Sequence, residues 1–121
     1  TLGPTQYMIT AAGSGIDRLH IDPPVRGAAL NIPIQIEEDW QFFLAANKKD
    51  LIEAPRTASN RKKFYYEPEK CSFFNCRVPW IFNSQSPHSF ANYAKTDRVI
   101  MSISFLEDYD TALRLIPEEW F

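Results

Sequence analysis

The stretch "DRVIMSISF" (residues 97–105) carries the strongest strand signal in the chain. Its side chains alternate between two faces, which is the period of a β-strand. One face is wholly apolar and is expected to pack in a core. The other begins with Arg98 and continues through Ser102 and Ser104. A guanidinium on such a face would lie buried in a cavity and need an anion there, and its planar fork matches a carboxylate. Either serine could add a hydroxyl donor.

The stretch "RGAALNIPIQI" (residues 26–36) alternates just as regularly. One face is aliphatic and is expected to pack in the core, whereas the other is small and polar and suits the wall of a cavity. We expect Leu30, Ile32, Ile34 and Ile36 on the first face, and Ala29, Asn31, Pro33 and Gln35 on the second.

The remaining segments are shorter and are separated by turn residues. Residues 46–63 are polar and broken, which predicts a long loop or a hairpin with an excursion. Near the end, Asp108 or Asp110 would cap a short helix over 111–116 that stops before Pro117. We expect strands over 39–45, 63–68 and 76–83, and a short strand at the end of 84–92.

This pattern predicts a mostly β fold with a short C-terminal helix. Roughly seven or eight short strands are punctuated by turn signals and joined by long connections rather than tight hairpins. Such a pattern favours a double-sheet jelly roll, cupin-like in form, over a meander barrel. The 121 residues suffice for a single domain, 1–121.

Composition narrows the functional classes. The net charge is −2, so no basic balance favours nucleic acid, and the longest apolar runs are far too short for a membrane span. The only two cysteines, Cys71 and Cys76, are too few for a disulfide framework. We expect them to be reduced side chains in a cytoplasmic protein; two thiolates at this spacing are only a weak signal for a metal.

The stretch "LHIDPP" (residues 19–24) holds a histidine and a carboxylate two residues apart. In a strand both would point the same way, either as a solvated pair at a strand end or as two metal ligands. The only other histidine, His88, would be the third ligand, although by itself it is typical of a turn after a proline. Two histidines and one carboxylate on one face of an ion leave three positions open, which suits non-haem Fe(II).

Four segments together resemble the Fe(II)- and 2-oxoglutarate-dependent dioxygenases, especially the prolyl/aspartyl-hydroxylase-like and phytanoyl-type branches. The resemblance covers about residues 16–106 and implies a double-stranded β-helix, or jelly roll. The segments are "HID" (20–22), "ALNIPIQ" (29–35), "PHSFAN" (87–92) and "DRVIMSISF" (97–105).

The resemblance also implies a function. His20, Asp22 and His88 look like the iron ligands, and Arg98 looks like the residue that binds the distal carboxylate of 2-oxoglutarate. Asn31 and Ser102 would contact the cosubstrate or substrate, and no catalytic residue is expected beyond the metal ligands. The reaction would use O₂ to hydroxylate a small molecule or a peptide side chain, with release of succinate and CO₂.

The chain departs from the family in its length. Members usually carry further helices and strands before the His-x-Asp strand, so this chain is either a fragment lacking part of the substrate pocket or a minimal version. Two other functions stay open. A cupin-type metal enzyme without 2-oxoglutarate would have no need of Arg98, and a non-catalytic jelly-roll binding module would need none of the four residues.

Overall fold

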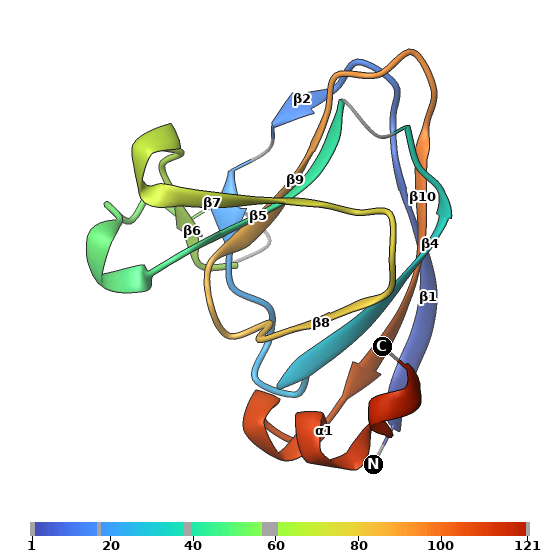
Figure 1. Cartoon of the computed structure of the whole chain (residues 1–121). Helices are drawn as coiled ribbons and strands as arrows, with labels where there is room; N and C mark the ends of the chain where they lie inside the picture. Colours follow the sequence, from blue (N-terminus) through green and yellow to red (C-terminus); the bar gives the residue numbers. More distant parts are fainter. Residues whose placement is uncertain (1, 17, 38–39, 57–60, 121) are drawn as a thin grey trace.

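The computed structural model describes residues 2–16, 18–37, 40–56 and 61–120. Within them the chain forms two antiparallel β-sheets and one short α-helix near the C-terminal end, which confirms the mostly β expectation (Figure 1). No helix in the described part of the chain has the length and apolar character needed to cross a membrane.

The first sheet has the strand order β1-β10-β4-β8. Figure 1 shows β1, β10 and β4 side by side, with helix α1 (Tyr109–Leu115) at one end of this sheet. The helix begins after Asp108, whose side chain accepts a hydrogen bond from the Thr111 amide. The strands are β1 (Leu2–Thr10), β4 (Ala28–Gln35), β8 (Trp80–Phe82) and β10 (Arg98–Phe105).

The second sheet has the strand order β6-β3-β9-β5-β7, and β2 also pairs with β9. Its strands are β2 (Gly15–Ile16), β3 (Leu19–His20), β5 (Gln41–Ala46), β6 (Lys63–Phe64), β7 (Cys71–Asn75) and β9 (His88–Asn92). Three 3₁₀ turns complete the chain, at Lys48–Asp50, Pro68–Lys70 and Glu118–Trp120.

The core lies on both sides of the first sheet. Between the sheets, the inward face of β10 is fully buried from Arg98 to Ser104, as its alternation predicts. On the outer face, α1 covers Leu30 and Phe105 with Ala112 and Ile116. The prediction that one aliphatic face of 26–36 packs in the core is only partly right. Ile34 is not part of this outer cluster, and its side chain is 57% exposed. The inner cluster consists of Ala29, Phe43, Cys76, Phe82 and Phe90.

Several predicted boundaries are wrong. The strand expected over 63–68 ends at Phe64, and the strand expected over 76–83 is limited to β8. Strands β1 and β7 were not predicted at all. Both lie at sheet edges and are largely exposed, so neither has a clean apolar alternation, and pairing with β10 and β5 forms them. Residue 39 of the strand expected over 39–45 and residues 57–60 of the expected loop lie outside the described residues.

Gly27 joins the turn after β3 to strand β4, and its amide donates to the Phe105 carbonyl at 3.0 Å. A Cβ at this position would overlap the Glu107 carbonyl group, which is backbone and cannot move away cheaply. We therefore expect Gly27→Ala to lower the free energy of unfolding by about 1–3 kcal/mol, measured by urea denaturation. Val25→Ala, in the same turn at a side chain that is 71% exposed, is the control and should change it little. Equal stability of the two variants would contradict the steric argument.

Candidate metal centre

The three predicted ligands come together at one end of the second sheet. His20 ends β3 and His88 begins β9, and the two face each other directly in the strand register. Asp22 lies just beyond the end of β3 rather than within a strand. Its amide donates to the Ser84 carbonyl at 3.0 Å, and this contact places the carboxylate beside the two rings.

The donor atoms of this cluster converge on one point. The Oδ1 atom of Asp22 lies 3.6 Å from Nε2 of His20 and 3.5 Å from Nε2 of His88. All three donor atoms lie within 4.8 Å of one another. Two donors about 2.1 Å from an ion and at right angles to each other are about 3 Å apart. The cluster is therefore slightly wider than a loaded site, and a small inward shift would let it hold an ion.

Hydrogen bonds orient both imidazoles for binding a metal. The Nδ1–H group of His88 donates to the Ser86 carbonyl at 2.8 Å, and Nδ1 of His20 faces the Arg18 carbonyl at 3.4 Å. The Nδ1 contacts leave Nε2 of both rings facing Asp22. That atom donates to the carboxylate when the imidazole is protonated, and it offers a lone pair to a metal when the imidazole is neutral. Phe43 stacks on the His88 ring at 6.0 Å between centroids, and Phe82 meets the same ring at 4.8 Å.

The electrostatics of the site favour the protonation states that a metal needs. Burial and the neighbouring His88 lower the pKa of His20 to about 4, although Asp22 opposes this shift, so His20 is neutral at pH 7. Burial alone would raise the pKa of Asp22, but His88, Arg26 and His20 outweigh it and hold that pKa below its usual value. A neutral imidazole and an ionised carboxylate are ligand-competent forms.

The sequence analysis missed one residue of this site, Arg26. Its Nε atom lies 3.1 Å from Oδ2 of Asp22, and its Nη2 group donates to the Ser102 hydroxyl at 2.6 Å. Only 13% of the Arg26 side chain is exposed. The sequence did contain a signal for this residue: Arg26 follows Asp22 by four positions across a Pro-Pro turn, and this spacing brings the two charges together.

Arg98 is fully buried, as expected, and has few polar contacts. Its Nη1 group reaches the Thr10 hydroxyl at 3.3 Å, and its guanidinium lies over the Phe90 ring at 3.7 Å. Within the described residues, Nε and Nη2 have no hydrogen-bond partner. Burial lowers the pKa of Arg98 to about 10, against a smaller opposing effect of Cys76, and the group stays charged at pH 7. A buried cation with open donors is an anion site in chemical terms.

Asn31 and Ser102 lie opposite each other on β4 and β10. Both are fully buried. Neither polar atom of the Asn31 carboxamide has a hydrogen-bond partner among the described residues, whereas the Ser102 hydroxyl accepts from Arg26. Ser102, four residues along β10 from Arg98, is thus connected to Asp22 of the cluster through Arg26.

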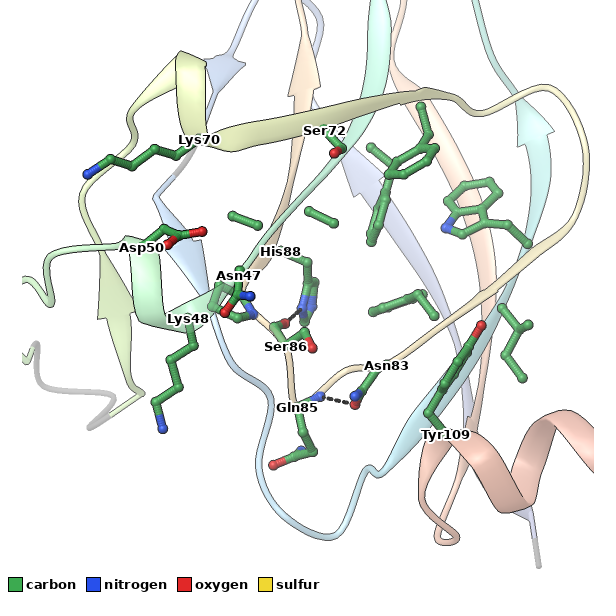
Figure 2. A pocket seen from close by; sticks show the side chains of 18 of the residues that line it. Asn47, Lys48, Asp50, Lys70, Ser72, Asn83, Gln85, Ser86, His88 and Tyr109 are labelled. Atoms are coloured by element: carbon green, nitrogen blue, oxygen red, sulfur yellow. Dashed lines mark hydrogen bonds between the residues drawn. The ribbon is translucent and has the colours of Figure 1, made fainter.

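Two cavities meet at His88 and Phe82. The smaller one, of about 420 Å³, is lined by all three candidate ligands together with Arg26 and Phe90. The larger one, of about 1000 Å³, opens beside the ring of His88 (Figure 2). Arg98 lines neither cavity, but the Phe90 ring against its guanidinium also lines the smaller one. The larger cavity has an aromatic wall of Phe43, Phe74, Trp80 and Phe82.

The low pKa of His20 predicts a pH-dependent stability of the metal-free protein. The unfolded chain binds a proton at His20 near pH 6.5 but the folded chain only near pH 4, so the stabilisation is complete above pH 6.5 and is lost as the pH falls toward 4. We expect His20 to account for a loss of roughly 3 kcal/mol between pH 7 and pH 4. Urea denaturation with a chelator present should show a weaker pH dependence in His20→Gln, and identical pH dependence in both proteins would refute the assignment.

Comparison of the chain with models of protein families, with characterised proteins and with solved structures finds no match in any of the three. The function is therefore argued from the geometry and chemistry of this site.

Proposed function

We propose that this protein is an Fe(II)- and 2-oxoglutarate-dependent oxygenase that hydroxylates a small molecule or a peptide side chain. The observation that carries the proposal is the convergence of His20, Asp22 and His88 in a cavity whose Phe90 wall packs against the buried guanidinium of Arg98. Two nitrogens of this guanidinium, Nε and Nη2, have no hydrogen-bond partner among the described residues. A metal site and an anion site then lie next to each other between the sheets.

The strand order supports a jelly roll. Strands β1, β4, β8 and β10 belong to one sheet, and β3, β5, β7 and β9 belong to the other. With β2 and β6 also in the second sheet, the chain crosses between the sheets at six of the nine connections between successive described strands. The other three join β2 to β3, β5 to β6 and β6 to β7 within the second sheet. This alternation is typical of the double-sheet jelly roll with two Greek keys.

The donor set supports iron as the metal. Two imidazoles and one carboxylate, with no fourth protein ligand in the described cluster, leave room for further ligands on an octahedral ion. Iron bound there would supply the oxidative chemistry with O₂ and 2-oxoglutarate, with release of succinate and CO₂. The residues of the chain would hold the ion, orient the cosubstrate and exclude water.

Arg98 would bind the distal carboxylate of the cosubstrate. The Arg26–Ser102 hydrogen bond links the metal cluster to β10, the strand that carries Arg98 on the same face as Ser102. The Arg98 guanidinium also lies over the ring of Phe90, which is two residues from His88 on the same face of β9. A dicarboxylate with one end at the metal would extend toward the guanidinium. Because the Phe90 ring lies against that guanidinium, the ring has to move aside for a carboxylate to reach it. Asn31, with its unpaired carboxamide beside Ser102, would add hydrogen bonds.

The larger cavity would receive the substrate. It adjoins His88, and its volume of about 1000 Å³ is at the upper end of the range for small-molecule sites. Its aromatic wall favours a substrate with an apolar part. In Figure 2 the ammonium groups of Lys48 and Lys70 point away from His88, so they do not place positive charge next to that ring.

A second candidate is a metal enzyme of the cupin type that does not use 2-oxoglutarate. The packing of Phe90 against Arg98 favours this candidate. The face of the ring stabilises the positive charge of the guanidinium, and the ring separates the guanidinium from the cavity. The two candidates share the metal ligands and differ only in whether Arg98 binds a carboxylate.

Addition of Fe(II) and then 2-oxoglutarate without oxygen tests the proposal. We expect a weak visible charge-transfer band that needs both additions. His20→Ala and Asp22→Ala should lose iron binding and 2-oxoglutarate turnover, because each removes one of three donors. Normal turnover in either variant would remove that residue from the site.

Arg98→Met separates the two candidates. The variant should still bind Fe(II) but bind 2-oxoglutarate at least about tenfold more weakly, since a hydrogen bond to a charged group contributes about 1.5–3 kcal/mol. Arg114→Met, on the exposed surface of α1, is the matched control and should behave as the original protein. An unchanged 2-oxoglutarate affinity in Arg98→Met, or no band in the folded original protein, would favour the cupin-type enzyme.

A further inference from the structure

The two oxygens of the Asp22 carboxylate have different surroundings. Oδ1 faces the Nε2 atoms of both histidines, at 3.6 and 3.5 Å, whereas Oδ2 faces Nε of Arg26 at 3.1 Å. The carboxylate is 9% exposed, so water has little access to either oxygen. One oxygen is therefore directed at the metal position, and the other is directed at a cation.

Arg26 is itself held in place by several contacts. Its Nη2 group donates to the Ser102 hydroxyl at 2.6 Å, and its amide donates to the Pro23 carbonyl at 2.9 Å. Its own carbonyl accepts from the Ser84 hydroxyl and, at 2.9 Å, from the side chain of Gln85. The same Gln85 amide group donates to the Asp22 carbonyl at 3.1 Å. The guanidinium is thus fixed relative to the turn that carries Asp22 and to strand β10.

We propose that Arg26 is a positioning residue that makes Asp22 bind the metal through one oxygen only. The inference rests on the proposed metal site and deepens it. A carboxylate can bind a cation through one or both oxygens. A positively charged guanidinium against Oδ2 attracts that oxygen and so competes with the metal for it. The ion then has three protein donor atoms and three open positions, enough for a chelating cosubstrate and O₂.

Loss of Arg26 has a specific consequence under this proposal. Oδ2 becomes free to join Oδ1 on the metal, which retains the ion but occupies a fourth position. The number of adjacent pairs of open positions falls from three to one, and the positive charge of Arg26 is lost, so an anionic chelating ligand binds more weakly. If Arg26 only holds the turn together, its loss instead weakens metal binding and folding together and has no particular effect on chelating ligands.

The test uses Co(II) as the probe metal and acetohydroxamate as the probe chelator. Acetohydroxamate needs two adjacent open positions but has no distal carboxylate, so its binding does not depend on Arg98. The visible absorption spectrum of bound Co(II) reports its coordination, and titration gives both affinities. The variants are Arg26→Met and Arg26→Lys, with Arg114→Met as a remote control on the surface of α1.

We expect Arg26→Met to bind Co(II) within about threefold of the original protein, with a changed Co(II) spectrum and an affinity for acetohydroxamate at least about tenfold lower. Arg26→Lys should recover part of that affinity, because an ammonium restores the charge but not the planar fork. Arg114→Met should match the original protein. An unchanged spectrum and acetohydroxamate affinity in Arg26→Met would overturn the proposal.

Two further results keep the outcomes distinct. If Arg26→Met fails to fold by circular dichroism, Ser102→Ala replaces it; it keeps the charge but removes the acceptor of Nη2, and should lower acetohydroxamate affinity by about two- to fivefold. An unchanged affinity in that variant overturns the proposal. If the original protein binds Co(II) and acetohydroxamate but not 2-oxoglutarate, the proposed oxygenase function fails while the role of Arg26 stands. If it binds no Co(II), both fail.

Discussion

The pairing of His20 with His88 across β3 and β9 is the constraint on which the site depends. Strand β3 has only two residues, yet its register places the two imidazoles next to each other, with ring centroids 4.5 Å apart and ring planes tilted by 57°. A slip of one residue would turn His20 to the opposite face of the sheet and separate the donors. The third donor is fixed by the hydrogen bond from the Asp22 amide to the Ser84 carbonyl, four residues before β9 begins at His88. Backbone hydrogen bonds between distant segments thus bring the three side chains together.

The space between the sheets holds buried polar groups that have no hydrogen-bond partner among the described residues. Asn31 and Arg98 are both fully buried, and both have side-chain polar atoms without partners among the described residues. Each buried unpaired group costs about 1–3 kcal/mol, and the contact of Arg98 with Phe90 offsets only part of this cost. A fold that keeps such groups gains stability when a ligand pairs with them, because binding to the folded state alone shifts the unfolding equilibrium. Metal and anion binding would therefore act on the stability of this protein as well as on its chemistry.

Strong alternation made β4 and β10 predictable, together with the faces on which Asn31 and Arg98 lie. Asp108 was one of two predicted helix caps, and the helix begins directly after it, at Tyr109. Strand β1 was missed although it is the longest strand described, because its exposed edge position does not require an apolar face. The same holds for β7, whose side chains are mostly exposed. Edge strands form because they pair with a neighbouring strand, and the local hydrophobic pattern of the edge strand gives little information about that neighbour.

The sequence by itself determined which chemistry is available: two histidines, one nearby carboxylate and an arginine at the start of an inward strand face. Parity along a strand is a local property, so the direction of Arg98 followed from its neighbours alone. Only the tertiary structure decided that Arg26 holds the second oxygen of Asp22, that its other end meets Ser102, and that Phe90 covers Arg98. The Arg26–Ser102 contact joins residues 76 positions apart. Such contacts depend on strand register and on the path of turns between sheets, which arise from the packing of the whole domain rather than from any short stretch of sequence.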